Sequence, residues 1–235
     1  MTGVPPGSVS PGPRDPDQNR LRTLGRKVRR RLAANKAVQR IAADKAELWA
    51  VPRFFDPLEC GRLISIIDRS AVPSFAHGDY AKALRTSYSA DVDPHDPFTC
   101  GLQQRIDDLL GIEPSFGETI QGQRYTVGQH FSAHNDWFPT GSAVWKNEAR
   151  FGGQRSFTAM AYLNAVEEGG ETDFPDLDIA IRPQPGMLLV WSNMDENGVP
   201  NRYTLHAGHP VRRGVKYIIT KWYRCRPWVA HPLSQ

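Results

Sequence analysis

The spacing of hydrophobic residues changes along the chain, from a helical pattern in the first half to a strand pattern in the second half. Two helices are predicted in the first half. One begins at Pro57, because Asp56 and Glu59 hold the positions of a capping box and apolar residues recur behind them. The other is predicted over 97–110, where apolar residues share one helical face and Gly111 follows as a stop signal.

From residue 118 onward, short runs rich in β-branched and aromatic residues alternate with connections rich in Gly, Pro, Asn and Asp, which predicts strands. These runs cover residues 118–127, 155–163, 172–174, 187–191 and 215–223. A further short strand is expected over 51–55, ahead of the first helix. Helices followed by many short strands predict an α+β fold, in which an antiparallel sheet closes as a jelly-roll-like double layer.

Length and composition limit the protein classes that fit this chain. With 235 residues, 40% of them hydrophobic, one domain of roughly 190 residues with a tail is expected rather than two domains. Cys60, Cys100 and Cys225 match neither a zinc pattern nor a disulfide framework, which favours a reducing compartment. No apolar run reaches the roughly 18 residues of a membrane span, and the N-terminus lacks the apolar segment of a secretory signal. We therefore expect no membrane partner and a cytoplasmic location.

The formal net charge of +4 is unevenly distributed, since residues 1–40 hold ten basic and two acidic residues. Residues 1–19 are rich in Pro, Gly, Ser and Asp and are predicted to be disordered. Residues 20–48 carry apolar residues at roughly helical intervals among many cations, which predicts a basic amphipathic helix. We predict a tail over 1–48 and a folded domain over 49–235. The tail either contacts nucleic acid or an acidic partner, or its helix packs on the domain as a solvated element.

His134 and Asp136 are the first candidates for metal ligands. They are two residues apart, so on an extended strand both side chains point to the same side and can converge on one ion. His206, at the start of another strand-like run, is the candidate for a third ligand. Two histidines and one carboxylate suit non-haem Fe(II) and leave coordination positions open. A hydrogen-bonded surface pair is the alternative for His134 and Asp136 taken alone.

Lys216 lies on an apolar face of the predicted strand 215–223. A lysine in such a place is costly to bury unless its charge is paired, and the carboxylate of a ligand could pair it. A hairpin turn predicted over 211–214 would place His206 and Lys216 on adjacent antiparallel strands. The predicted metal site and the predicted carboxylate site would then be neighbours.

Four motifs resemble those of the Fe(II)/2-oxoglutarate-dependent dioxygenases, and most closely those of the prolyl 4-hydroxylase branch. They are R-T-S at 85–87, R-Y-x-x-G-Q-x-x-x-x-H-x-D at 124–136, Y-L-N-x-x-x-x-G-G-x-T-x-F-P at 162–175 and H-A-G-x-P-V-x-x-G-x-K at 206–216. The resemblance covers residues 49–228 in order and leaves the tail outside. It implies a double-stranded β-helix (jelly-roll) core with N-terminal helices packed on the major sheet.

The resemblance also implies a role for each matching residue. His134, Asp136 and His206 would bind Fe(II). Lys216 would pair with the distal carboxylate of 2-oxoglutarate, and Tyr125 would hydrogen-bond to this cosubstrate.

Three further residues have weaker assignments. Thr172 is implied in the sheet wall near the cosubstrate, Trp222 in the lining of the pocket, and Arg85 on the substrate side. An ordinary salt bridge is the alternative for Arg85. The polar segment 139–153, directly after the H-x-D motif, is expected to be a loop that could act as a lid over a substrate.

The activity implied is hydroxylation of a C–H bond, foremost of a prolyl residue in a peptide or protein. Fe(II), 2-oxoglutarate and O2 would be used, succinate and CO2 released, and ascorbate would serve as a reductant. Two alternatives remain open. The substrate could be a free amino acid or another small molecule, or the chain could be a jelly-roll binding domain without catalysis. The sequence makes no prediction of the oligomeric state.

Overall fold

The computed structural model describes residues 15–42, 44–74 and 85–229. Its helices are α1 Gln18–Ala34, α2 Pro57–Ser70, α4 Pro97–Leu110 and α5 Ala143–Glu148, with 3-10 turns η1 Pro114–Phe116, η2 Pro175–Leu177 and η3 Arg202–Thr204. Its strands are β1 Gln39–Ala42, β2 Leu48–Val51, β3 Val72–Pro73, β4 Tyr88–Asp91, β5 Gln121–Tyr125, β6 Phe131–His134, β7 Arg155–Tyr162, β8 Glu168–Gly169, β9 Thr172–Phe174, β10 Ile179–Ile181, β11 Leu188–Ser192, β12 His206–Gly208, β13 Val211–Arg213 and β14 Lys216–Arg224.

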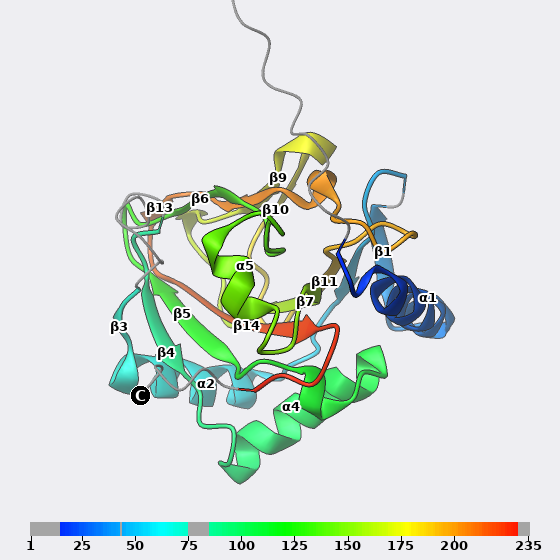
Figure 1. The fold of residues 1–235 in the computed structure, drawn as a ribbon. Helices are drawn as coiled ribbons and strands as arrows, with labels where there is room; N and C mark the ends of the chain where they lie inside the picture. The colour runs from blue at the N-terminus through cyan, green and yellow to red at the C-terminus, as the bar shows by residue number, and fades with distance from the viewer. Residues whose placement is uncertain (1–14, 43, 75–84, 230–235) are drawn as a thin grey trace, which may run out of the picture.

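Two antiparallel sheets face each other within these residues (Figure 1). The larger sheet has eight strands in the order β1-β2-β11-β7-β14-β5-β4-β3, and the smaller has four in the order β10-β9-β12-β6. A separate pair, β13 and β8, joins the connections between them. This double layer confirms the predicted α+β jelly-roll fold, and the helices α2 and α4 lie along one side of the large sheet (Figure 1).

The central strands of the large sheet are buried on both faces, because helices cover one face and the small sheet covers the other. On β7, Ala159 and Ala161 belong to the apolar cluster that also includes Leu63 of α2 and Ile106 of α4. Met160 and Tyr162 of the same strand belong to the cluster between the two sheets. Successive side chains of a strand point to opposite faces, so every second residue of β7 and β14 faces the space between the sheets. A polar residue in that space needs a partner there.

Local sequence signals place two helices correctly. α2 begins at Pro57 with the complete capping box between Asp56 and Glu59. α4 has the predicted bounds and ends at Gly111, whose φ of 64° lies in the left-handed region that favours glycine. No helix among the described residues is both long and apolar enough to cross a membrane.

The boundary predicted at residue 49 leaves out α1, which packs on the domain in the structure. Leu21, Val28 and Leu32 of α1 are buried, and β1 and β2 form one end of the large sheet. The predicted helix over 20–48 is therefore shorter and ends at Ala34, and residues 39–42 of the same segment form β1. The predicted strand over 51–55 is instead β2, three residues earlier. Of the segment predicted to be disordered, residues 1–14 lie outside the described residues.

The segment 139–153 is not a plain loop, because it contains α5. Ser142 caps this helix by accepting a hydrogen bond from the backbone N–H of Trp145. In Figure 1, α5 lies across the end of the two-sheet layer nearest the viewer. Its predicted role as a lid stays a prediction.

Candidate metal and cosubstrate site

One cavity between the sheets collects seven of the eight residues that the sequence singles out: His134, Asp136, His206, Lys216, Tyr125, Thr172 and Trp222. They come from both sheets, and the segments that carry them are far apart in the sequence. The jelly-roll fold therefore brings together in space residues that the motifs show only as separate positions in the sequence. Arg85 does not line this cavity.

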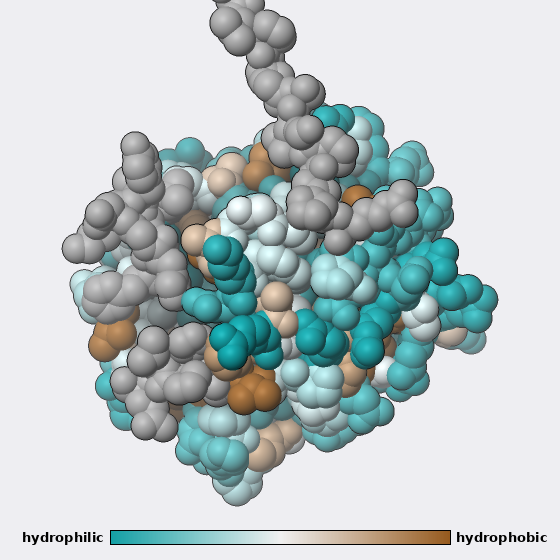
Figure 2. Space-filling view, in the orientation of Figure 1, coloured by the Kyte–Doolittle hydropathy of each residue, from teal (hydrophilic) through white to brown (hydrophobic). Residues whose placement is uncertain are grey.

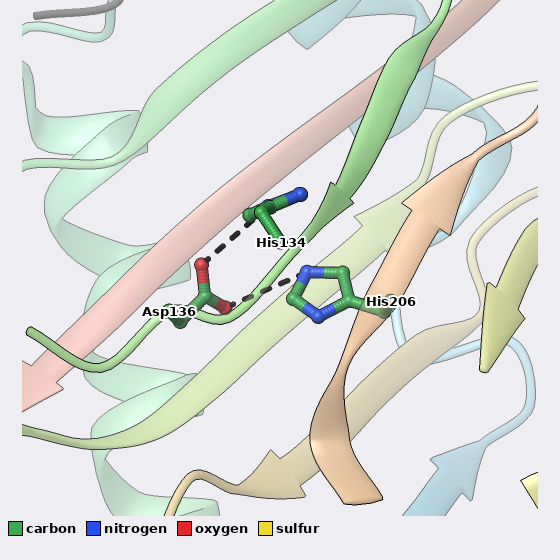
Figure 3. A group of neighbouring side chains, drawn as sticks. All are labelled: His134, Asp136 and His206. Carbon is green, nitrogen blue, oxygen red and sulfur yellow. Dashed lines mark ion pairs between the residues drawn. The ribbon is translucent and has the colours of Figure 1, made fainter. Parts of the chain in front are cut away.

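His134, Asp136 and His206 form a compact group of possible ligands (Figure 3). His134 Nε2 lies 3.9 Å from Asp136 Oδ1, and His206 Nε2 lies 3.8 Å from Asp136 Oδ2. One donor atom from each residue lies within 4.8 Å of the other two. His206 and His134 are direct partners across the β12–β6 pair. Asp136 lies two residues beyond the end of β6, in a bend rather than on the strand as predicted.

Backbone carbonyls orient both imidazole rings. His134 Nδ1 lies 2.9 Å from the carbonyl oxygen of Ser132, and His206 Nδ1 lies 2.9 Å from that of Thr204. A carbonyl oxygen accepts a hydrogen bond, so each Nδ1 carries a proton, and in the neutral ring Nε2 is then the nitrogen with the lone pair. Both Nε2 atoms face Asp136 and are ready to bind a metal ion.

A buried polar network holds the carboxylate of Asp136. The Thr158 hydroxyl donates to Asp136 Oδ2 at 2.7 Å, and the Asn193 amide donates to the Thr158 hydroxyl at 3.0 Å. Burial would raise the pKa of Asp136, but the neighbouring His206 and His134 and the Thr158 hydrogen bond outweigh it, so this pKa is lowered. Asp136 is therefore held as an anion, the form that binds a metal ion.

Aromatic rings pack around the two histidines. Phe131 stacks on His134 with 3.7 Å between ring centroids, and Trp191 meets His206 edge-on at 4.9 Å. Burial, followed by the charge of His206, lowers the pKa of His134 to about 3. The ring of His134 is thus neutral at physiological pH, as metal binding requires.

Lys216 is a buried lysine for which the described residues supply no counter-ion. This residue is 2% exposed, and its Nζ lies 5.5 Å from the ring centroids of both Tyr125 and Tyr162. Among the described residues no acidic side chain forms an ion pair with it, and Glu171 acts on it from farther away. Burial lowers the pKa of Lys216 to about 7. A buried cation of this kind is costly unless a ligand anion pairs with it.

The structure places His206 and Lys216 in different sheets, so their predicted position on adjacent strands is wrong. His206 begins β12 in the small sheet, whereas Lys216 begins β14 in the large sheet. The turn between them crosses from one sheet to the other, and β13 pairs with β8 on the way. The two residues therefore face the same cavity from opposite walls.

Tyr125 lies directly opposite Lys216 in the β5–β14 pair. Its hydroxyl donates a hydrogen bond to Gln123 Oε1 at 2.7 Å. To donate to a cosubstrate, as predicted, the Tyr125 hydroxyl would have to give up this bond to Gln123. The Gln123 amide in turn donates to the Thr220 hydroxyl at 3.2 Å. The cavity wall next to Lys216 is thus a chain of hydrogen-bonding side chains.

The three weaker candidates differ in position. Thr172 is buried in the small sheet and accepts a hydrogen bond from the Tyr162 hydroxyl at 2.7 Å. Trp222 has a buried indole N–H without a partner among the described residues. Arg85 donates to Ser87, and its guanidinium lies 5.0 Å from the ring centroid of Phe131. It therefore touches the site through Phe131 rather than by lining the cavity.

Several residues of the site are missed by motif reasoning. Thr158, Gln123 and Thr220 lie on the inner face of the large sheet, where polar residues interrupt apolar strands. The signal available in the sequence is this polar residue at a buried alternating position. Such a polar residue can be recognised as part of the site only when the inner face of each strand is known.

The residues present fit an Fe(II) ion and a dicarboxylate. Two imidazole nitrogens and one carboxylate oxygen are the donor set of non-haem Fe(II), and three ligands leave coordination positions open. The unpaired ammonium of Lys216 lies in the same cavity and suits the far carboxylate of 2-oxoglutarate.

Comparisons with known proteins agree with this geometry. The family description "2OG-Fe(II) oxygenase superfamily" matches residues 120–224, which contain all three candidate ligands and Lys216. The chain is 30% identical over 207 residues to prolyl 4-hydroxylase 2 of Arabidopsis thaliana, covering 77% of this chain and 68% of that protein.

Solved structures show the same architecture. The 2OG complex of the viral collagen prolyl hydroxylase from Paramecium Bursaria Chlorella virus-1 matches with a TM-score of 0.61 and 29% identity, covering 75% of this chain and 95% of that chain. A Trichoplax adhaerens prolyl hydroxylase in complex with a hypoxia inducible factor peptide fragment matches with a TM-score of 0.56 and 17% identity, covering 91% and 94%. The second similarity concerns the fold alone. On its motifs, its site and its 30% identity to the Arabidopsis relative, this chain belongs to the 2OG-Fe(II) oxygenase superfamily.

Proposed function

We propose that this protein hydroxylates a prolyl residue of a peptide or protein, using Fe(II), 2-oxoglutarate and O2. The observation that carries the proposal is the unpaired Lys216 in the same cavity as His134, Asp136 and His206. The choice of a prolyl substrate is supported by two relatives, a prolyl 4-hydroxylase at 30% identity and a viral collagen prolyl hydroxylase at 29%.

His134, Asp136 and His206 would hold the iron through two Nε2 atoms and one carboxylate oxygen. Bound Fe(II) and 2-oxoglutarate would activate O2, the oxidant, so that one oxygen atom enters the C–H bond and the other enters succinate, which forms with release of CO2. The protein's own part is to orient the metal ligands and the cosubstrate and to exclude water. The carbonyls of Ser132 and Thr204 hold the Nδ1 protons and so direct both Nε2 atoms toward the metal.

Lys216 would hold the distal carboxylate of the cosubstrate as an ion pair shielded from water. A charge-assisted hydrogen bond of this kind is stronger than a neutral one, and burial strengthens it further. Tyr125 and Thr172 would add hydrogen bonds from the adjoining walls. The apolar side chains of Met160 and Ile218 line the same cavity and limit the access of water.

The exposure of the site favours a substrate that approaches from the side of His134. The side chain of His134 is 25% exposed, whereas those of Asp136 and His206 are 4% and 8% exposed. Lys216, at 2%, lies in the closed part of the cavity. A segment of a peptide chain can pass such an opening without entering it fully. The alternative of a free amino acid remains, because a small molecule can also reach an open metal face.

Two finer points belong to the proposal. Ascorbate would act as the reductant that restores oxidised iron, in keeping with the prolyl 4-hydroxylase resemblance. The cytoplasmic location stays a prediction from the sequence.

The test is hydroxylation of a proline-rich peptide in the presence of Fe(II), 2-oxoglutarate and O2. Mass spectrometry should show the addition of one oxygen atom at proline, and a peptide with alanine in place of proline should stay unmodified. Lys216→Met should abolish the reaction, because the distal carboxylate loses its partner. Oxidation of free proline but not of the peptide would favour the small-molecule alternative. Oxidation of neither, with active cosubstrate turnover, would show that the substrate is not proline.

A further inference from the structure

The exposed side of α1 is strongly basic and lies outside the site described above. The helix contains six arginines and one lysine and no acidic residue. Six of these cations are exposed, and four of them form what we call the α1 basic surface: Arg22, Arg26, Lys27 and Arg30. The other two are held by neighbours, Arg20 by Asp17 and Arg31 by the carbonyls of Asp108 and Leu109. In Figure 2 the region over α1, at the right of the view, is predominantly hydrophilic. The opposite side of the helix supplies the buried Leu21, Val28 and Leu32.

The cations of the α1 basic surface lack partners among the described residues. No acidic side chain there forms an ion pair with any of the four. Two other cations of the helix do have partners, since Arg20 pairs with Asp17 and Arg29 with Glu47. The helix thus carries two kinds of cation, those in ion pairs with the rest of the domain and those that face the solvent.

A hollow lies beside this surface and is held in place by the adjoining loop. Arg22, Arg26 and Arg29 line it on one side, and Glu196 and Asn197 line the other. The loop is fixed to α1 by a hydrogen bond from Gln18 to the carbonyl of Asn197 at 3.2 Å. Arg29 also donates to the carbonyl of Asp195 at 2.9 Å.

Gly198 is required for this close approach. It has a φ of 76°, and a Cβ at this position would lie 2.3 Å from the carbonyl oxygen of Gln18 and 2.7 Å from the backbone nitrogen of Arg22. Any larger residue would push the loop away from the helix. The hollow with its three arginines is therefore a fixed feature of the fold.

We propose that the α1 basic surface binds the phosphate backbone of a nucleic acid. Guanidinium groups bind phosphates through paired hydrogen bonds, and arginine dominates this helix. Arg22 and Arg30 are eight residues apart, a span of about 12 Å. A nucleic-acid duplex presents about seven phosphate charges over that length. Four unpaired cations on one rigid helix suit such a repeating row of charges.

The composition of the same surface argues against an anionic membrane and against an acidic protein as the partner. The exposed residues of α1 other than its cations are Asn, Thr and Ala, so no large apolar side chain is available to enter a lipid layer. An acidic protein partner would be expected to meet aromatic or apolar anchors, which this face also lacks. Backbone phosphates need none of these features.

The test is the binding of the full-length protein to a fluorescent single-stranded oligouridylate and to a mixed-sequence DNA duplex, followed by anisotropy over a series of salt concentrations. Arg22→Gln with Arg26→Gln should weaken binding about tenfold at low salt and lower the slope of log affinity against log salt by about two. Glu196→Gln should strengthen binding, because it removes the carboxylate from the wall of the hollow. The comparison of the two probes shows whether RNA or DNA is preferred.

The matched control is Arg212→Gln with Arg213→Gln, which removes the same charge from exposed arginines paired with Glu168 and Glu167. This pair should leave the affinity and the salt slope close to the wild-type values. Succinate formation should be unchanged in both double variants, because none of the four arginines lines the catalytic cavity. The proposal fails if neither probe binds at low salt or if the control pair weakens binding equally. It also fails if polyglutamate or anionic vesicles bind as tightly as the nucleic acids.

Discussion

The hydroxyl of Thr158 on β7 donates a hydrogen bond of 2.7 Å to Oδ2 of Asp136, from the large sheet to a residue beyond the end of β6. Asn193 donates to the same hydroxyl, so the three side chains form a directed chain. Asp136 is 5% exposed, and Thr158 and Asn193 are fully buried. This relationship links the candidate metal site to the centre of the large sheet and fixes the orientation of the Asp136 carboxylate.

Thr158→Val should therefore weaken Fe(II) binding by about tenfold or more, the usual cost of losing a partner of a metal ligand. The substitution keeps the shape of the side chain and removes the donor to Asp136. Anaerobic titration of Fe(II) against a chromophoric chelator measures the affinity. Thr23→Val, on the exposed side of α1, serves as the control. An unchanged Fe(II) affinity in Thr158→Val would show that this hydrogen bond does not support the metal site.

The affinity for 2-oxoglutarate should fall as the pH rises above about 7. Burial lowers the pKa of Lys216 from 10.5 to about 7 in the protein without cosubstrate, and a bound carboxylate raises it again. Above the lower pKa, binding must take up a proton, which costs up to about tenfold in affinity per pH unit. Below it, Lys216 is already charged and the affinity should level off.

Anaerobic calorimetry across this pH range measures the effect. Lys216→Arg is the control, because a guanidinium stays protonated at every pH tested. Its affinity should not show the same decline. A wild-type affinity that is constant from pH 6 to pH 9, about one unit below to two units above the Lys216 pKa, would contradict the burial of an unpaired ammonium.

A second buried lysine has a structural role that can be separated from that of Lys216. Lys221 Nζ and the Tyr223 hydroxyl both donate to Asp107 Oδ1 at 2.6 Å, joining β14 to α4. Lys221→Met should lower the free energy of unfolding by about 3 kcal/mol, because Asp107 stays buried with its charge unpaired. Combining Lys221→Met with Asp107→Leu should restore part of the loss. Denaturant unfolding measures both, and a double variant as unstable as the sum of the singles would refute the pairing.

Deletion of residues 1–34 should destabilise the domain strongly, whereas deletion of residues 1–14 should not. The longer deletion removes Leu21, Val28 and Leu32, each worth about 2 kcal/mol when fully buried. Thermal unfolding followed by circular dichroism distinguishes the two proteins. Equal melting temperatures would mean that α1 is a dispensable tail, as the charge distribution alone suggests.

The local signals in the sequence are sufficient for two helices and for the three candidate ligands that the fold brings together. Capping residues around Pro57 and Gly111 act within a few residues, so their effect can be read without tertiary information. The start of the folded domain could not be read in this way. In α1 the dense cations hide a stripe of leucine and valine whose burial depends on contact with distant strands.

The geometry of the site depended on how the chain crosses between the sheets. A hairpin between His206 and Lys216 is the simplest interpretation of the intervening turn, but the fold places the two in opposite sheets. The support from Thr158 could not be predicted either, because it comes from β7 of the large sheet, whereas the candidate ligand Asp136 follows β6 of the small sheet. Motifs identify the candidate ligands of the metal and the cosubstrate, whereas the sheet topology determines which side chains orient those ligands.

The most direct test of the central claim is oxygen-dependent conversion of 2-oxoglutarate to succinate by protein loaded with Fe(II) under anaerobic conditions. Wild-type protein should form succinate when O2 is admitted. Asp136→Ala should lose Fe(II) binding and turnover, and Lys216→Met should keep Fe(II) binding and lose turnover. Folded wild-type protein that binds no Fe(II) and forms no succinate would contradict the oxygenase assignment and leave a jelly-roll binding domain.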